Sequence, residues 1–191
     1  MNRRGLALVS VATLAAAAGG VWRWRQEAAQ GELASVPESA PGADAGVRAS
    51  AAFSLWDQQV ERLDGSTLAL SSLRGRRLLV NFWATWCPPC VREMPLFEQF
   101  HREHGGAANA RAWQVLGLAI DRREAVAAFL QRQPVSYPIG LAGLDGTQWS
   151  RELGNDKGGL PFTVAFDAQG RVLQRKLGEI SEMELKAWAA L

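Results

Sequence analysis

The stretch NFWATWCPPCVREMP, residues 81–95, decides the fold of this chain. Its first four residues are the end of a nearly continuous apolar run from Leu78 to Ala84, which is typical of a β-strand buried on both faces. A helix is expected from about Cys87 to the glycine pair at 105–106, because glycine commonly ends helices. Pro95 should kink that helix. The sequence therefore predicts a buried strand that leads straight into a helix carrying two cysteines.

Cys87 and Cys90 are three residues apart, a spacing that lets them form and reopen a small disulfide ring on the first helical turn. The N–H groups and partial positive charge of a helix N-terminus stabilise a thiolate, so Cys87 is the predicted nucleophile. Cys90, one turn further in, is the predicted resolving thiol, which releases the mixed disulfide. Pro88 and Pro89 remove two backbone donors and stiffen the ring.

Two thiols can also serve other chemistry. A zinc site needs two further ligands, and the only histidines, His101 and His104, are expected on the solvated side of the helix. We therefore predict no metal site and no cofactor. Cu(I) is a soft ion that two thiolates can hold, so a copper-handling protein is the alternative. A peroxiredoxin-type peroxidase is less favoured, because the proline expected four residues before Thr85 is missing.

The start of the chain predicts export across a bacterial inner membrane. Of the 21 basic residues, four arginines lie in residues 1–25; the remaining 17 stand against 19 acidic ones, which removes the case for a nucleic-acid partner. The uncharged run from Gly5 to Trp22 fits either a signal peptide or a membrane anchor. Residues 26–50, rich in Ala, Gly, Ser, Pro and Glu, predict a flexible linker.

Residues 51–191 alternate strand and helix signals. In chain order these are a hairpin around the turn Asp64-Gly65, a strand Val115–Ile120, a helix capped by Asp121, a short helix at 149–155, a hairpin around Gly170, and a helix from Glu182 to Leu191 capped by Ser181 with Glu184 in a capping box. A parallel start and an antiparallel finish predict an α/β domain whose mixed sheet has helices on both faces.

Over residues 51–191 the chain resembles the thioredoxin superfamily, and within it the membrane-tethered TlpA/ResA-like group, which includes CcmG-type cytochrome c maturation reductases. The resemblance rests on NFWATWCPPCVREMP, on the hairpin before it, and on GLPFTVAFDAQGRV at 159–172. It implies a thioredoxin-like three-layer fold with a mixed central sheet and an N-terminal β-hairpin extension.

The resemblance also implies where substrate binds. Pro161 takes the place of a cis-proline that lies opposite the cysteine pair and helps hold the substrate backbone, with Leu160 facing the substrate. Trp86, Pro88 and Pro89, which flank or separate the cysteines, complete the expected substrate-binding residues.

Two positions bear on proton transfer. Asn81 stands where cytosolic thioredoxins carry a buried Asp that accepts the proton of the resolving thiol. Glu93, one helical turn after Cys90, stands where ResA-like proteins have a Glu. We predict that Glu93 is catalytic: it manages the proton of Cys90 and raises the thiol pKa values by like-charge repulsion. The alternative is a surface Glu93 paired with Arg92 or Arg102.

The resulting functional hypothesis is a thiol–disulfide oxidoreductase on the periplasmic side of the inner membrane, or in the soluble periplasm if the leader is cleaved. It would reduce disulfides of exported proteins such as apocytochrome c, as a monomer. A reductase in an oxidising compartment needs a dedicated electron donor, and the resemblance implies a membrane donor of the CcdA/DsbD type. Residues 137–159 are the predicted specificity region.

Overall fold

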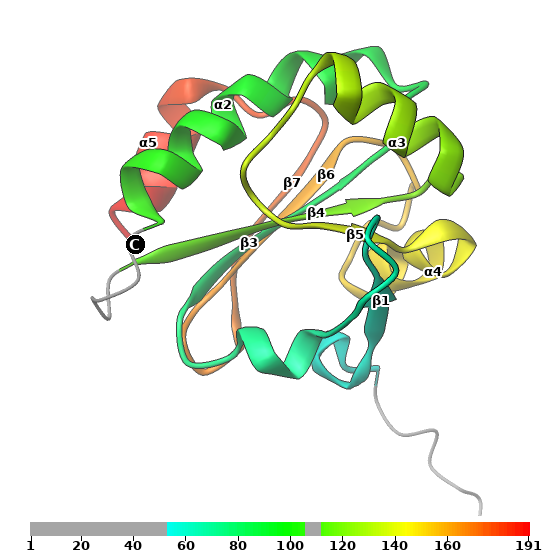
Figure 1. Cartoon of the computed structure of the whole chain (residues 1–191). Coiled ribbons are helices and arrows are strands. Elements are labelled where there is room, and N and C mark those ends of the chain that lie inside the picture. Colours follow the sequence, from blue (N-terminus) through cyan, green and yellow to red (C-terminus); the bar gives the residue numbers. More distant parts are fainter. Residues whose placement is uncertain (1–52, 106–111) are drawn as a thin grey trace, which may run out of the picture. The chain divides into compact units, whose positions relative to one another are not determined.

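The computed structural model describes residues 53–105 and 112–191 (Figure 1). The predicted leader, residues 1–25, and the predicted linker, residues 26–50, lie outside the described residues. No helix within the described ranges is long and apolar enough to cross a bilayer.

A seven-stranded sheet with the order β2-β1-β5-β4-β3-β6-β7 organises the described part of the chain. The strands are β1 (Gln59–Glu61), β2 (Thr67–Ala69), β3 (Arg77–Trp83), β4 (Trp113–Ala119), β5 (Ile139–Leu141), β6 (Phe162–Phe166) and β7 (Val172–Leu177). The helices are α2 (Pro88–His104), α3 (Arg123–Arg132), α4 (Gly143–Glu152) and α5 (Glu182–Ala189), with short 3-10 helices at Leu55–Asp57 and Leu70–Leu73.

The sheet is mixed, as the sequence predicts. The strand β4 runs parallel to both β3 and β5, whereas β6 is antiparallel to β3 and to β7. The hairpin of β1 and β2 joins the sheet through a single antiparallel pair with β5. These pairings confirm the three-layer α/β fold and the N-terminal hairpin extension.

The central strand β3 explains why helices must cover both faces. Its side chains alternate between two apolar clusters. Leu79 and Trp83 pack with α2, α3 and α5 on one face. Leu78, Val80 and Phe82 pack with α4 and the 3-10 helices on the other (Figure 1). All five side chains are at most 1% exposed, which accounts for the apolar run that only Asn81 interrupts in the sequence.

Local signals fix both ends of α2. Cys87 is its N-cap residue, and two prolines occupy the first helical positions, where a missing N–H costs nothing. Gly105 caps the C-terminus by donating its N–H to the His101 carbonyl. Pro95 lies inside the helix.

The sequence-based prediction is wrong in the region between α3 and β6. It misses β5 and shortens α4, because glycines at 140, 143 and 146 weaken both patterns. Tertiary packing explains two of them. A Cβ at Gly140 would lie 2.5 Å from Val60 Cγ2, and a Cβ at Gly146 would lie 2.9 Å from Ile120 Cγ1. These glycines therefore let neighbouring elements approach closely.

The predicted capping role of Asp121 is also wrong, because Arg122 is the N-cap residue of α3 and makes no side-chain capping bond. The Asp121 carboxylate instead binds the segment before Cys87, as described below.

The capping box of α5 is confirmed and can be tested. The Ser181 hydroxyl accepts a hydrogen bond from the Glu184 N–H, and the Glu184 carboxylate accepts from the Ser181 N–H. We expect Ser181→Ala to lower the free energy of unfolding by about 1 kcal/mol, measured by urea denaturation. The exposed Ser71 provides the control, since Ser71→Ala should stay within about 0.5 kcal/mol of the parent chain. Equal effects of the two substitutions would contradict the capping role.

Candidate active site

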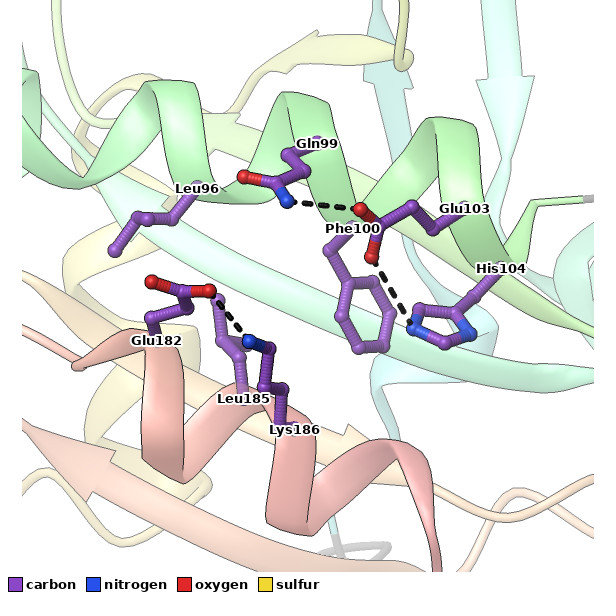
Figure 2. A pocket seen from close by; sticks show the side chains of 8 residues that line it. All are labelled: Leu96, Gln99, Phe100, Glu103, His104, Glu182, Leu185 and Lys186. Atoms are coloured by element: carbon purple, nitrogen blue, oxygen red, sulfur yellow. Dashed lines mark hydrogen bonds and ion pairs between the residues drawn. The ribbon is translucent and has the colours of Figure 1, made fainter.

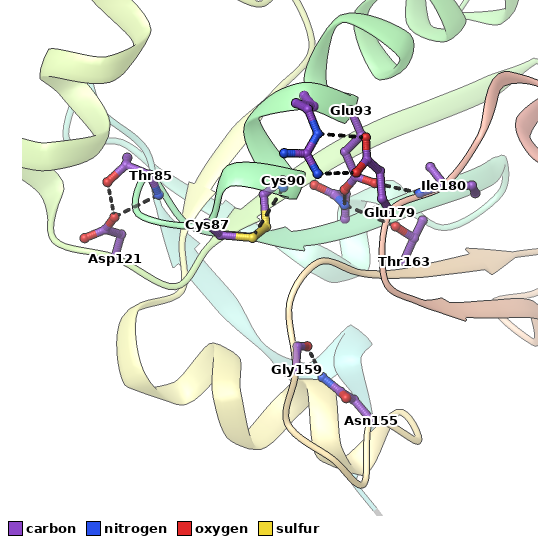
Figure 3. The surroundings of a disulfide bond; sticks show 12 residues. Thr85, Cys87, Cys90, Glu93, Asp121, Asn155, Gly159, Thr163, Glu179 and Ile180 are labelled. Carbon is purple, nitrogen blue, oxygen red and sulfur yellow. Dashed lines mark hydrogen bonds and ion pairs between the residues drawn. A yellow bond between two sulfur atoms is a disulfide. The ribbon is translucent and has the colours of Figure 1, made fainter.

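The two cysteines form a disulfide at the start of α2, with an S–S distance of 2.02 Å (Figure 3). The sulfur of Cys87 accepts a hydrogen bond from the Cys90 N–H at 3.3 Å. Cys87 is 4% exposed and Cys90 is fully buried. Cys87 is therefore the sulfur that a substrate reaches first, and the helix N-terminus is aimed at it.

A carboxylate holds the segment that precedes the pair. Asp121, just beyond β4, accepts hydrogen bonds from the Thr85 N–H at 3.0 Å and from the Thr85 hydroxyl at 2.5 Å (Figure 3). Burial raises the pKa of Asp121, but hydrogen bonds from Thr85 and from the Arg122 N–H outweigh it, so the pKa lies below its usual value. Sequence reasoning missed this anchor, which ties the loop before Cys87 to the end of the neighbouring strand.

Glu93 is buried beneath the helix, so the surface alternative is wrong. Its Oε1 accepts a hydrogen bond from the Asn81 side-chain amide at 2.7 Å, and its Oε2 accepts from the Ile180 N–H at 3.0 Å. The same amide of Asn81 also donates to the Thr163 hydroxyl at 3.1 Å. The carboxylate thus joins α2 to β3 and to the segment before α5 (Figure 3).

The two arginines considered as partners of Glu93 pair with other carboxylates. Arg92 binds Glu179 at 2.6 Å, and Arg102 binds Glu98 at 2.7 Å. Both arginines lie on the exposed side of α2.

Burial raises the pKa of Glu93 to about 7, although the hydrogen bonds from Ile180 and Asn81 partly oppose the shift. The negative charge of Glu179 adds to the increase. A carboxyl group with this pKa exchanges its proton near neutral pH, as a general acid or base must. Glu93 lies one helical turn after Cys90, the cysteine whose sulfur is buried, on the same helix.

A groove of about 600 Å³ runs beside Cys87. Its lining residues come from the cysteine loop, from α4 and from the loop before β6: Trp86, Cys87, Pro88, Pro89, Ile120, Leu144, Thr147, Ser150, Gly158, Gly159 and Leu160. Trp86 is 65% exposed on its wall. The structure thus brings the proposed substrate-binding residues Trp86, Pro88, Pro89 and Leu160 together, along with part of the predicted specificity region.

The loop before β6 faces the cysteine pair from across this groove. The peptide bond between Leu160 and Pro161 is cis, as the resemblance implies, and Pro161 itself is buried. Asn155 holds the loop by donating from its side-chain amide to the Gly159 carbonyl at 2.9 Å (Figure 3). The Gly158 N–H in turn donates to the Asn155 carbonyl. The backbone beside Leu160 is therefore fixed before substrate arrives.

The histidines are less solvated than predicted. His101 and His104 are both half-buried, because their rings pack against Tyr137 and Phe100, at centroid distances of 6.2 and 4.7 Å. His104 lies at a shallow pocket between α2 and α5, together with Phe100 (Figure 2). Across residues 53–105 and 112–191, no group of three or more His, Cys, Asp or Glu side chains is placed to hold a metal ion.

Known proteins resemble this chain in sequence and in fold. The Redoxin family model matches residues 44–191. Thiol-disulfide oxidoreductase ResA of Bacillus cereus (strain ZK / E33L) is 26% identical over 131 residues, which cover 68% of this chain and 70% of that protein. A thioredoxin-related protein from Neisseria meningitidis serogroup B has a solved structure with a TM-score of 0.59 and 32% identity, covering 70% of this chain and 96% of that one. The solved structure of a secreted thiol-disulfide isomerase from Corynebacterium glutamicum has a TM-score of 0.61 and 25% sequence identity. The match covers 69% of this chain and 80% of that one.

The raised pKa of Glu93 predicts a specific dependence of stability on pH. In the unfolded chain this carboxyl loses its proton near 4.5, whereas in the folded chain it keeps the proton up to about 7. Between these values the folded state binds more protons, so the free energy of unfolding falls as the pH rises. From about pH 5 to about pH 7.5 this single group should lower it by about 2 kcal/mol.

The measurement is urea denaturation of the oxidised chain, in which the cysteines do not titrate. Glu93→Gln should remove the part of the pH dependence that comes from this carboxyl. The difference in free energy of unfolding between the variant and the parent should therefore change by about 2 kcal/mol from about pH 5 to about pH 7.5. Glu124→Gln, at an exposed position on α3, is the matched control and should follow the parent chain. A difference that stays constant with pH would show that Glu93 titrates in the folded chain as it does in the unfolded one.

Proposed function

Since the chain belongs to the Redoxin family, and to the TlpA/ResA-like thiol–disulfide oxidoreductases within the thioredoxin superfamily, we propose that it works as a disulfide reductase of exported proteins. The observation that carries this proposal is the buried Glu93 carboxyl one turn beyond Cys90. A negative charge there disfavours thiolates on the same helix. Because a stabilised reduced form makes a dithiol oxidising, a destabilised one makes the pair a better electron donor.

The reaction proceeds by two exchanges. The Cys87 thiolate attacks one sulfur of a client disulfide, and the other client sulfur leaves as a thiolate. Cys90 then gives its proton to the Glu93 carboxylate, and the Cys90 thiolate attacks the sulfur of Cys87. The second client sulfur leaves, the client gains two electrons, and the Cys87–Cys90 disulfide forms.

Asn81 suits this role in both protonation states of Glu93. Its Nδ2 donates to the carboxylate, while its buried Oδ1 has no hydrogen-bond partner among the described residues. Rotation of the amide would present that oxygen to a protonated Glu93 as an acceptor. An Asp in place of Asn81 would instead put a second carboxyl group beside that of Glu93, and the like charges would raise the free-energy cost of ionising either carboxyl.

The proposed setting is the periplasmic side of the inner membrane, with residues 1–25 as anchor or cleaved signal. The secreted Corynebacterium glutamicum neighbour supports an extracytoplasmic location. Apocytochrome c is the proposed client, and a CcdA/DsbD-type membrane protein is the proposed donor that restores the dithiol. The chain acts as a monomer in this proposal.

Trapping tests the reductase directly. Cys90→Ser removes the resolving thiol, so clients should remain joined to Cys87 through a disulfide and be identified by mass spectrometry as exported proteins. The Cys87→Ser variant is the control and should capture none of them. Capture that persists in this control, or no capture by Cys90→Ser, would contradict the proposed direction of attack.

Glu93→Gln tests the electrostatic argument. Removing the negative charge should lower the pKa of the reduced cysteines and make the reduction potential less negative, by about 30 mV for each 1.4 kcal/mol of lost repulsion. Thiol alkylation rates against pH and equilibration with a glutathione buffer measure the two quantities. The exposed-site variant Glu124→Gln should leave both unchanged. Identical thiol titrations in the parent and Glu93→Gln chains would remove the support for a reductase.

A further inference from the structure

Leu144 is an apolar side chain that the fold leaves unburied. It lies on the first turn of α4 and is 89% exposed, more than the other large apolar side chains in the described ranges. Leu144 and the 65% exposed Trp86 line the same groove, which also contains Cys87. Two exposed apolar side chains at one groove indicate a binding surface.

The position of Leu144 is fixed by the way α4 packs. Gly146 on the same helix lets α4 lie close to Ile120, since a Cβ at that glycine would come within 2.9 Å of Ile120 Cγ1. Gly143 begins α4 with a φ of 52°, a conformation that glycine adopts without strain. Leu144 also borders a second hollow of about 170 Å³, shared with Asp121 and Arg122. Leu144 therefore forms a ridge between the groove and that hollow.

Apart from Cys87, none of the residues that line the groove has an ionisable side chain, and Cys87 itself is neutral once it is joined to the client in the mixed disulfide. The Ser150 hydroxyl is already used, since it donates to the Thr147 carbonyl at 2.9 Å and accepts from the Asn155 amide. A charged side chain placed against these residues would lose part of its hydration and find no ionised partner among them. The chemistry of the groove selects an apolar side chain.

We propose that Trp86 and Leu144 clamp an apolar side chain of the client, close in its sequence to the cysteine that Cys87 attacks. The occupant is a client segment, because the mixed disulfide forms at Cys87 and Cys87 lines the groove. This inference rests on the proposed function and adds a substrate preference to it. Leu144 acts by binding the client, and it takes no part in the sulfur chemistry.

The test compares two synthetic disulfide peptides that differ only in the residue beside one cysteine, Leu in one and Asp in the other. With the full chain in a single detergent, kcat/KM for the Leu peptide should exceed that for the Asp peptide by about 10-fold, through KM. Leu144→Asp should abolish the preference, and Leu144→Met should retain it. Met183 is 78% exposed on α5, outside the groove, so Met183→Asp is the matched control and should keep the full preference.

Equal kcat/KM values for the two peptides, or a preference that survives Leu144→Asp, overturn the clamp and leave the reductase intact. If the chain reduces neither peptide, the proposed reductase fails, and the clamp is then tested as the same preference in oxidation of the dithiol peptides by the disulfide form. A dimer that Leu144→Asp dissociates in analytical ultracentrifugation would identify a second copy as the occupant and also overturn the proposal.

Discussion

The buried carboxyl of Glu93 is the interaction on which the site depends. It receives one hydrogen bond from Asn81 on the central strand and one from the Ile180 backbone before α5, so three parts of the fold meet at one group. Ile180 is followed by the capping box of α5, and Asn81 by the last strand residues before the cysteine loop. Because the carboxyl is enclosed by these elements, its proton affinity is set by the fold and the fold's stability is in turn sensitive to its proton.

Local chemistry made much of this structure predictable. Three of the predicted features each depend on residues within one element or one turn, so the sequence alone reveals them. They are the apolar run from Leu78, the cysteine pair with its two prolines, and the Ser181–Glu184 capping box. The contacts that escaped prediction join distant segments. Asp121 binds Thr85, 36 residues away, and no local pattern distinguishes it from a helix-capping Asp. Likewise, Gly140 weakens the strand pattern of β5 in the sequence. The glycine is there because the neighbouring strand β1 packs so closely that Val60 leaves no room for a Cβ.

The burial of Glu93 shows both the strength and the limit of a resemblance. The family pattern pointed to this position, while helix periodicity alone left a solvated Glu possible. Only the packed structure shows that Arg92 and Arg102 turn to other carboxylates and that no cation reaches Glu93 among its hydrogen-bond partners. The groove also depends on tertiary packing, since Trp86 and Leu144 come from different elements and line one groove only when α4 packs on Ile120. The groove therefore combines residues beside the cysteines with Leu144 on α4, and the α4 side can vary without changing the cysteine loop itself.

The chain has two cysteines, and both belong to one disulfide whose more accessible sulfur opens on one groove. It can therefore carry one electron pair at a time and has no internal relay to pass that pair to a second surface. Whatever reduces the disulfide must approach the same sulfur as whatever consumes the dithiol. Donor and client are then mutually exclusive visitors, and turnover follows a ping-pong scheme in which an excess of either one competes with the other.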